Sequence, residues 1–252
     1  MKKYKWRIIA PALALAVLAF AFWYGGGAPG LRGWNPGAAG SAGAEHLTAE
    51  EKLALAASMA GDAPSETVLP GDAEYSAGQG MRIDENTGKD RYLTDPVPEG
   101  KPVPAEPQDT EISDVARTCE LSVRCDTILD NMDWLDKEKH ELVPEDGVIF
   151  PATEVTFYEG ESVFNVLTRE MKRAGIHMEF MNTPIYNSAY IEGINNLYEF
   201  DVGELSGWMY KVNGWFPNYG CSRYRLRDGD VVEWVYTCSL GIDVGGYSAV
   251  GG

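Results

Sequence analysis

The chain has 252 residues and a formal net charge of −17. Such an acidic chain repels the phosphate backbone of nucleic acids, so we exclude nucleic acid as a partner. It also repels an anionic membrane surface, which keeps a folded domain away from any bilayer to which the chain is tied.

The N-terminus combines a basic start with an apolar run. Basic residues lie among the first seven positions, and an uncharged stretch of about 17 residues follows at positions 8–24, the short end of a membrane span. This order predicts that the N-terminus stays in the cytoplasm and that the rest is exported. We favour an uncleaved signal-anchor over residues 1–24, with a cleaved signal as the alternative. The expected location is the cell membrane, with the C-terminal domain at the cell surface.

Residues 25–116 are rich in Gly, Ala, Pro and acidic side chains and poor in aromatic and β-branched residues. Such a segment buries too little apolar surface to offset its ordering entropy. The prolines between Asp95 and Asp109 favour an extended spacer. We therefore expect a disordered stalk over residues 25–116, a folded domain over 117–241 and a flexible tail over 242–252.

The folded part is predicted to contain several strands and one helix. Alternating apolar residues predict strands at residues 119–125 and near 155–157, and apolar residues at helical spacing predict a helix at 163–174. Ser162 is its expected N-cap and Gly175 its stop. A short strand near 177–180, a hairpin turned at Asn213-Gly214 and a last strand ending at Cys238 follow. One helix on a mixed sheet is an α+β fold of the β-grasp kind.

A polar and aromatic group surrounds the predicted hairpin. Both faces of a hairpin cannot be core unless the sheet is covered twice, so some rings are expected to face water. Tyr and Trp offer rigid contact area, and neighbouring amides and hydroxyls suit an uncharged ligand. The alternative stays open that the rings are core and that Asn and Ser form turns. The candidate ligand-binding residues are Tyr186, Asn187, Tyr190, Trp208, Tyr210, Trp215, Phe216, Asn218, Tyr219 and Ser222.

Catalytic and metal-binding motifs are lacking in the sequence. The histidines at positions 46, 140 and 177 are scattered and belong to no nucleophile or metal motif, so we predict neither an enzyme nor a metal site. Exported chains meet oxidising conditions, so we expect the cysteines at 119, 125, 221 and 238 to form two disulfides. Cys119 and Cys125 would lie about 20 Å apart on one strand, so each needs a distant partner.

Five segments of the folded part resemble a known family. They are CDTIL (125–129), FYEGESVFNVL (157–167), SAYIEGINNLYEF (188–200), SGWMYKVNGWFPNYG (206–220) and LRDGDVVEWVYTC (226–238). Together they resemble the bacterial domain of unknown function related to the C-terminal domain of transcobalamin and intrinsic factor. The resemblance implies a β-grasp-like module on an exported, often surface-attached protein. In the animal relatives the equivalent domain closes over cobalamin, beside an α-helical barrel domain.

The β-grasp arrangement and the resemblance lead to further expectations. A β-grasp sheet sets its first and last strands side by side and parallel, which pairs Cys125 with Cys238 and leaves Cys119 to Cys221. The expected function is binding of a small ligand, with cobalamin or a related corrinoid first, and no other cofactor. A vitamin transporter or an envelope protein is the expected partner. The alternative is a non-catalytic adhesion or scaffold module that contacts an envelope protein or a glycan.

Overall fold

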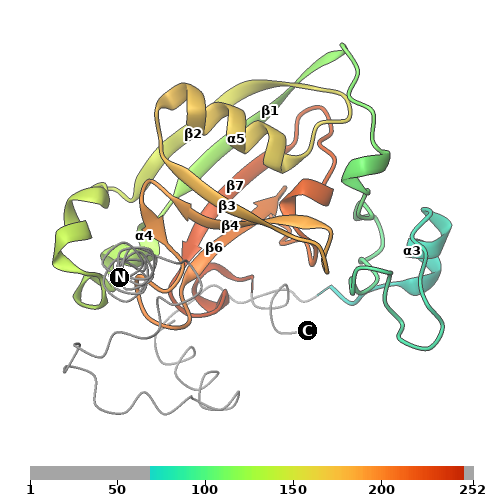
Figure 1. Cartoon of the computed structure of the whole chain (residues 1–252), viewed down its shortest axis with the longest axis horizontal. Helices are drawn as coiled ribbons and strands as arrows, with labels where there is room; N and C mark the ends of the chain where they lie inside the picture. The colour runs from blue at the N-terminus through green and yellow to red at the C-terminus, as the bar shows by residue number, and fades with distance from the viewer. Residues whose placement is uncertain (1–68, 247–252) are drawn as a thin grey trace, which may run out of the picture. The chain divides into compact units, whose positions relative to one another are not determined.

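Strands from both ends of the domain pair at its centre (Figure 1). The computed structural model describes residues 69–246. Its larger sheet has the order β2-β1-β7-β6, built from β1 (Ala116–Arg124), β2 (Val148–Tyr158), β6 (Gly207–Val212) and β7 (Val231–Thr237). β1 is antiparallel to β2 and parallel to β7, and β6 is antiparallel to β7. The predicted parallel pairing of the first and last strands is confirmed.

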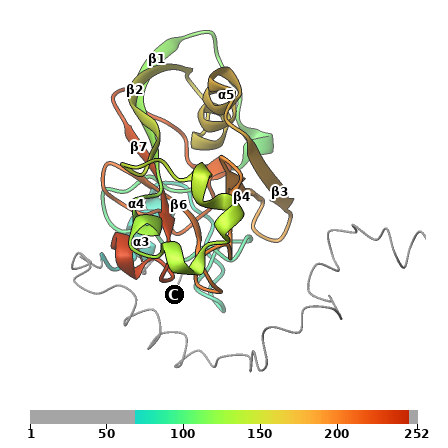
Figure 2. The same ribbon diagram turned by 90° about the vertical axis from the view of Figure 1, so that its left-hand side faces the viewer.

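One helix, α5 (Val163–Ala174), covers a face of this sheet (Figures 1 and 2). Its apolar residues are buried with Leu121 and Phe157 of the sheet in one core. Ser162 caps its N-terminus in a capping box with Asn165, and Gly175 ends it with a left-handed φ of 69°. The predicted helix, its cap and its stop are confirmed.

A smaller antiparallel sheet lies beside the helix. It contains β3 (Met178–Thr183), β4 (Ser188–Ile194) and β5 (Leu197–Tyr198) in the order β3-β4-β5. Ala189, Ile191 and Ile194 of β4 are buried in the common core, whereas most of β3 is exposed. The fold is therefore a mixed α+β arrangement with two sheets, and the core lies between them.

The Asn213-Gly214 turn is present, but the predicted hairpin is incomplete. Both turn residues have left-handed φ values, 52° and 73°, as a type I′ turn requires. Val212 and Trp215 exchange backbone hydrogen bonds of 2.8 and 3.1 Å across the turn. Beyond this bridge the returning chain forms no strand within the described residues, so β6 is the edge strand of the sheet.

Short helices complete the described part of the chain. They are α3 (Ala73–Gly78), α4 (Asp126–Leu129) and five 3-10 turns, η2 (Pro107–Asp109), η3 (Met132–Trp134), η4 (Lys137–Leu142), η5 (Cys221–Arg223) and η6 (Ile242–Val244).

Residues 69–116 differ from the disordered stalk expected there. Val97 is fully buried in the domain core, and Ser76 exchanges hydrogen bonds with its backbone at 3.0 and 3.2 Å. Polar contacts with residues that are distant in sequence also hold this segment in place. For example, the Tyr219 hydroxyl donates a hydrogen bond to the Pro102 carbonyl at 2.7 Å. Composition rules count apolar residues along the chain, so they miss order that comes from polar partners more than a hundred residues away.

The start of the predicted flexible tail is also ordered. In η6, Asp243 accepts a hydrogen bond from the Cys238 backbone at 2.7 Å, so the domain extends beyond the expected end at residue 241. The predicted signal-anchor (1–24), residues 25–68 of the predicted stalk and residues 247–252 of the tail lie outside the described residues. Within residues 69–246, every helix is too short or too polar to cross a membrane.

The predicted disulfides are absent, since all four cysteines are free and buried. The ladder between β1 and β7 ends at Arg124 and Val235, and the chain turns into α4 directly after Cys125. Cys125 and Cys238 are therefore not neighbours in this ladder, although the ideal β-grasp register predicted that they would be. Cys221 lies beside β4, where its thiol donates to the Ala189 carbonyl at 3.6 Å. Burial raises the pKa of each of the four thiols to about 12.

Candidate functional site

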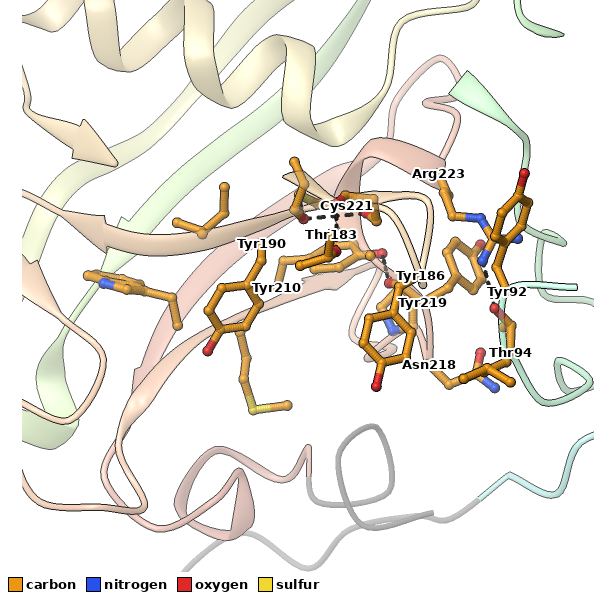
Figure 3. A pocket seen from close by; sticks show the side chains of 18 of the residues that line it. Tyr92, Thr94, Thr183, Tyr186, Tyr190, Tyr210, Asn218, Tyr219, Cys221 and Arg223 are labelled. Atoms are coloured by element: carbon orange, nitrogen blue, oxygen red, sulfur yellow. Dashed lines mark hydrogen bonds between the residues drawn. The ribbon is translucent and has the colours of Figure 1, made fainter. Parts of the chain in front are cut away.

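A cavity of about 290 Å³, here called cavity 1, opens beside β4 and β6 (Figure 3). Four separate segments contribute to it: residues 92–94, the β3–β4 hairpin, the stretch from β6 to η5, and Trp234 of β7. Figure 3 shows Tyr92, Thr94 and Arg223 together at one end and Tyr190 toward the other. The lining residues are Tyr92, Leu93, Thr94, Thr183, Tyr186, Ser188, Ala189, Tyr190, Ile191, Trp208, Met209, Tyr210, Pro217, Asn218, Tyr219, Gly220, Cys221, Arg223 and Trp234.

Buried aromatic rings form the inner part of cavity 1. Alternation along β6 turns Trp208 and Tyr210 toward the core. Trp208 donates its indole N–H to the Leu197 carbonyl at 2.8 Å, and Tyr210 donates its hydroxyl to the Tyr219 carbonyl at 2.7 Å. Burial holds the pKa of Tyr210 and of Tyr219 well above the ordinary value, so both phenols are neutral at physiological pH. This part of the wall is therefore aromatic and uncharged.

Two exposed tyrosines line the outer part of cavity 1. The exposed fractions of Tyr186 and Tyr190 are 52% and 42%. Tyr190 donates its hydroxyl to the Glu199 carboxylate, whereas no side-chain hydrogen bond ties Tyr186 to the described residues. The pKa of Tyr190 is raised by burial of its ring and, in addition, by its contact with the Glu199 carboxylate. The rim thus presents aromatic surface, and the hydroxyl of Tyr190 stays protonated.

The segment Tyr92–Thr94 supplies a wall that the sequence did not predict. Leu93 has a left-handed φ of 62°, a strained conformation for a branched residue, and its side chain is exposed. The Arg223 guanidinium lies 5.1 Å from the centre of the Tyr92 ring, and its Nη1 donates to Thr94 Oγ1 at 2.6 Å. Sequence reasoning placed these residues in the stalk, and no local motif distinguishes them.

Gly220 brings the chain after β6 close to β4 at the floor of the cavity. A Cβ on Gly220 would lie 1.9 Å from Ser188 Oγ and 2.4 Å from Ser188 Cβ. Only a residue without a side chain permits this approach.

Unpaired buried polar atoms gather around the cavities. Within the described residues, four buried side-chain nitrogen or oxygen atoms have no hydrogen-bond partner, and three belong to residues of cavity 1: Asn218 Oδ1, Arg223 Nε and Trp234 Nε1. The fourth, Arg225 Nε, belongs to a residue of a neighbouring cavity. Buried polar groups are paired almost everywhere in folded proteins, and exceptions gather where function imposes a cost.

Six of the ten candidate residues line cavity 1, namely Tyr186, Tyr190, Trp208, Tyr210, Asn218 and Tyr219. Asn187 and Ser222 instead line a second cavity of about 450 Å³, here called cavity 2. Asn187 donates from its amide to Glu106 and Gln108, and Ser222 Oγ contacts Ser188 Oγ at 2.9 Å.

Two candidate residues, Trp215 and Phe216, line neither cavity. The Trp215 ring lies beneath Lys101 Nζ at 5.4 Å, and Phe216 packs on Gly246. Both rings thus lie outside the two cavities, and their predicted part in ligand binding stays a prediction.

Among residues 69–246, no group of three or more His, Cys, Asp or Glu side chains is placed to hold a metal ion. His140 Nε2 lies 3.2 Å from the Leu135 carbonyl, and His177 lies beside the Tyr198 ring. His46 is outside the described residues.

Comparisons with known proteins match part of the domain. Residues 160–238, less than a third of the chain, match the family described as "Domain of unknown function (DUF4430)". No curated protein matches the chain. Haptocorrin, solved in complex with Cbi, is similar with a TM-score of 0.36 and 17% identity over 49% of this chain and 25% of haptocorrin. The chain thus spans about a quarter of the length of haptocorrin.

A second solved structure is a protein from Ruminococcus gnavus described as a candidate for metal binding. It is 15% identical, with a TM-score of 0.28, over 48% of this chain and 95% of that one. What this chain shares with known proteins is therefore a domain-level match to a family of unknown function, with distant likeness to solved structures.

Proposed function

We propose that cavity 1 binds a small uncharged molecule that has a broad apolar surface and a polar edge. The observation that carries this proposal is the convergence of aromatic rings from four segments on one cavity. Small-molecule sites are typically concave and mostly apolar, with a few polar groups that orient the ligand. Neutral tyrosines and the paired Arg223 leave the wall without a free charge for an ionic ligand.

The size of cavity 1 bears on how a ligand would fit. Its volume of about 290 Å³ lies at the small end of the range of about 300–1,000 Å³ for such sites. A larger ligand would place one edge in cavity 1 and extend over the exposed rings of Tyr186 and Tyr190. Asn218 and Tyr190 then offer an amide and a hydroxyl to the polar edge of the ligand.

A corrinoid such as cobalamin is the first ligand to test. The resemblance of the segments at residues 188–200 and 206–220 to the transcobalamin-related domain suggests it, and both segments contribute walls to cavity 1. A corrinoid has a flat macrocycle and a rim of amide side chains, which suits an aromatic wall with neutral hydrogen-bonding groups. A β-grasp-like domain that covers such a ligand from one side is the arrangement we propose.

Titration of the full chain with cyanocobalamin and with cobinamide tests this function, by heat release and by the absorbance of the corrin. We expect saturable binding that Tyr186→Ala weakens by about 1–2 kcal/mol, as for an aromatic contact at a binding hot spot. Tyr158→Ala is the matched control, because Tyr158 is exposed to a similar extent, 41%, on β2 and away from cavity 1. Binding that both variants weaken equally, or no binding at millimolar ligand, would refute the proposal.

We propose in addition that the chain is exported and held at the membrane through residues 1–24. The basic start and the apolar run support this location. A vitamin transporter or an envelope protein in the same membrane is the partner that such a ligand-binding domain would serve. Alkaline extraction of membranes tests the anchor, because an anchored chain stays in the pellet. Export is tested separately by protease added to intact cells.

A second function, contact with an envelope protein or glycan, is favoured by one observation. Met181, Ile185 and Tyr186 expose 49%, 61% and 52% of their surface around the turn between β3 and β4. Exposed apolar groups that gather on one projecting element are typical of interaction surfaces. Substitution of Ile185 by Ser separates the two functions, because Ile185 lies outside the lining of cavity 1 and its loss would leave corrinoid binding unchanged.

A further inference from the structure

Cavity 2 borders cavity 1 at the β3–β4 hairpin. Its volume is about 450 Å³, within the range of about 300–1,000 Å³ for small-molecule sites. The N-terminal end of α5, the β3–β4 hairpin and residues 107–112 surround it. Thr183, Ser188 and Ala189 line both cavities, so the hairpin forms a wall between them.

Three asparagines around cavity 2 keep unused hydrogen-bonding capacity. Asn182 makes no side-chain hydrogen bond within the described residues. Asn165 uses only its Oδ1, which accepts from the Ser162 backbone at 2.9 Å and from Ser162 Oγ at 2.7 Å. Asn187 uses only its Nδ2. Because an amide offers two donors and a carbonyl acceptor, the three together present both donors and acceptors to the cavity.

The lining of cavity 2 points to a neutral ligand. None of its residues is acidic, although the chain carries 38 acidic residues. Arg225 is its one charged lining residue, and both terminal nitrogens are engaged, Nη1 with the Gly160 carbonyl and Nη2 with Thr110 Oγ1. The nearby Glu106 carboxylate is shared between Arg223 and Asn187. The side chain of Ser162 caps the N-terminus of α5. An anion is therefore not needed to satisfy the backbone N–H groups at this end of the helix.

We propose that cavity 2 is a second binding site, which takes a neutral polyhydroxylated ligand such as a sugar ring. A hydroxyl both donates and accepts, so adjacent hydroxyls on a ring complement the NH₂ and C=O of an amide. The apolar side chains of Ile112 and Phe164 line the same cavity and suit the C–H face of a sugar. This inference does not depend on the ligand proposed for cavity 1.

Saturation-transfer NMR and heat titration of the full chain with four probes test this inference. The probes are methyl α-glucopyranoside, methyl β-galactopyranoside, N-acetylglucosamine and maltose, with sodium glucuronate as the charged comparison. A ligand of this size in a site with few contacts is expected to bind with a dissociation constant on the order of 1–10 mM. At least one neutral probe should bind, and glucuronate should bind no more tightly than the neutral glucose probe.

Two variants remove amide groups without disturbing the fold. Asn182→Ala removes a side chain that makes no internal hydrogen bond. Asn165→Asp keeps the oxygen that caps α5 and removes the NH₂ group. Each should weaken sugar binding about 3- to 10-fold, the loss of one hydrogen bond. Asn86→Ala is the matched control, because Asn86 is an exposed asparagine in a turn outside both cavities.

The outcomes separate this inference from the function proposed for cavity 1. No binding of any neutral probe at 50 mM, about five times the weakest expected dissociation constant, would overturn it. Binding that only glucuronate shows, or that Asn182→Ala and Asn165→Asp leave unchanged, would overturn it as well. Tyr186→Ala should leave sugar binding intact, whatever it does to corrinoid binding, because Tyr186 lines cavity 1 alone.

Discussion

Arg223 donates from Nη2 to the carboxylate of Asp90 at 2.6 Å, across 133 positions of the chain. Only 1% of the Arg223 side chain and 7% of the Asp90 side chain are exposed. Arg223 also reaches Glu106 at 2.8 Å and Thr94 at 2.6 Å. This buried network joins η5, at one end of cavity 1, to residues 92–94, which supply the wall at that end. The wall formed by residues 92–94 therefore depends on a charge pair, not on apolar packing alone.

Arg223→Met is expected to lower the free energy of unfolding by about 3–5 kcal/mol, because it leaves buried carboxylates without their partner. Urea unfolding followed by tryptophan fluorescence measures the change. Arg117→Met is the control, since the pair of Arg117 with Glu159 is exposed, with 43% and 47% of the side chains accessible. The control should cost no more than about 1 kcal/mol. Equal small losses in both variants would show that the Arg223 network contributes little.

Limited proteolysis tests the order of the segment before β1. We expect the resistant fragment of the full chain to retain residues 94–110, because Val97 is fully buried and Tyr219 and Arg223 bind this stretch. Mass spectrometry of the fragment left by proteinase K locates its N-terminus. A fragment that begins near residue 110 would instead support the disordered stalk that the composition predicts.

Gly220→Ala is expected to destabilise the domain by about 1–3 kcal/mol, the cost of forcing atoms into a packed interior. The added methyl group would meet Ser188, and relief of the clash would move β4 at the floor of cavity 1. Thermal unfolding measures the effect. Gly78→Ala is the matched control, because a Cβ at residue 78 meets nothing within 4 Å. The stability of this variant should equal or slightly exceed that of the unchanged protein. If both substitutions have the same effect, the close approach at Gly220 is not a constraint.

Thiol titration distinguishes free cysteines from disulfides. The folded chain should react slowly with a thiol reagent, because all four thiols are buried and protonated, with pKa values near 12. After unfolding in guanidinium without a reductant, all four free cysteines should react. A count of zero before reduction would restore the two disulfides predicted from the sequence.

Alkaline pH is expected to destabilise the fold. Burial raises the pKa of each thiol from 9.0 to about 12, and it raises the pKa of Tyr210 and Tyr219 well above 10.0. These groups ionise more readily in the unfolded chain, so their contribution is fully present below about pH 9 and is lost as the pH rises toward the folded-state values. Melting temperatures measured between about pH 8 and 11 should therefore fall. Melting temperatures that stay constant over this range would show that ionisation of the buried thiols and phenols does not control the stability of the fold.

Local signals in the sequence were sufficient for the secondary structure near the site. Ser162 and Gly175 mark the ends of α5 because a cap and a left-handed stop need only neighbouring backbone groups. Asn213 and Gly214 mark a turn for the same reason. The parallel pairing of β1 with β7 followed from the predicted β-grasp arrangement and is present. From the ring-rich segment, Trp208, Tyr210 and Tyr219 line cavity 1, and their part in ligand binding stays a prediction.

The tertiary structure alone decided which rings meet and what closes the cavity. Trp215 lies seven residues from Trp208 in the sequence, yet it packs beneath Lys101 outside cavity 1. Leu93 and Thr94 enter the site because Arg223 pairs with Asp90, a contact between residues far apart in sequence. The pattern of residues that are close in sequence indicates the local conformation of a segment and its apolar faces. This local pattern does not indicate which charged residue, distant in sequence, will pair with a buried charge. The composition of residues 69–110 therefore predicted disorder, whereas residues of the folded domain supply the partners that order this segment.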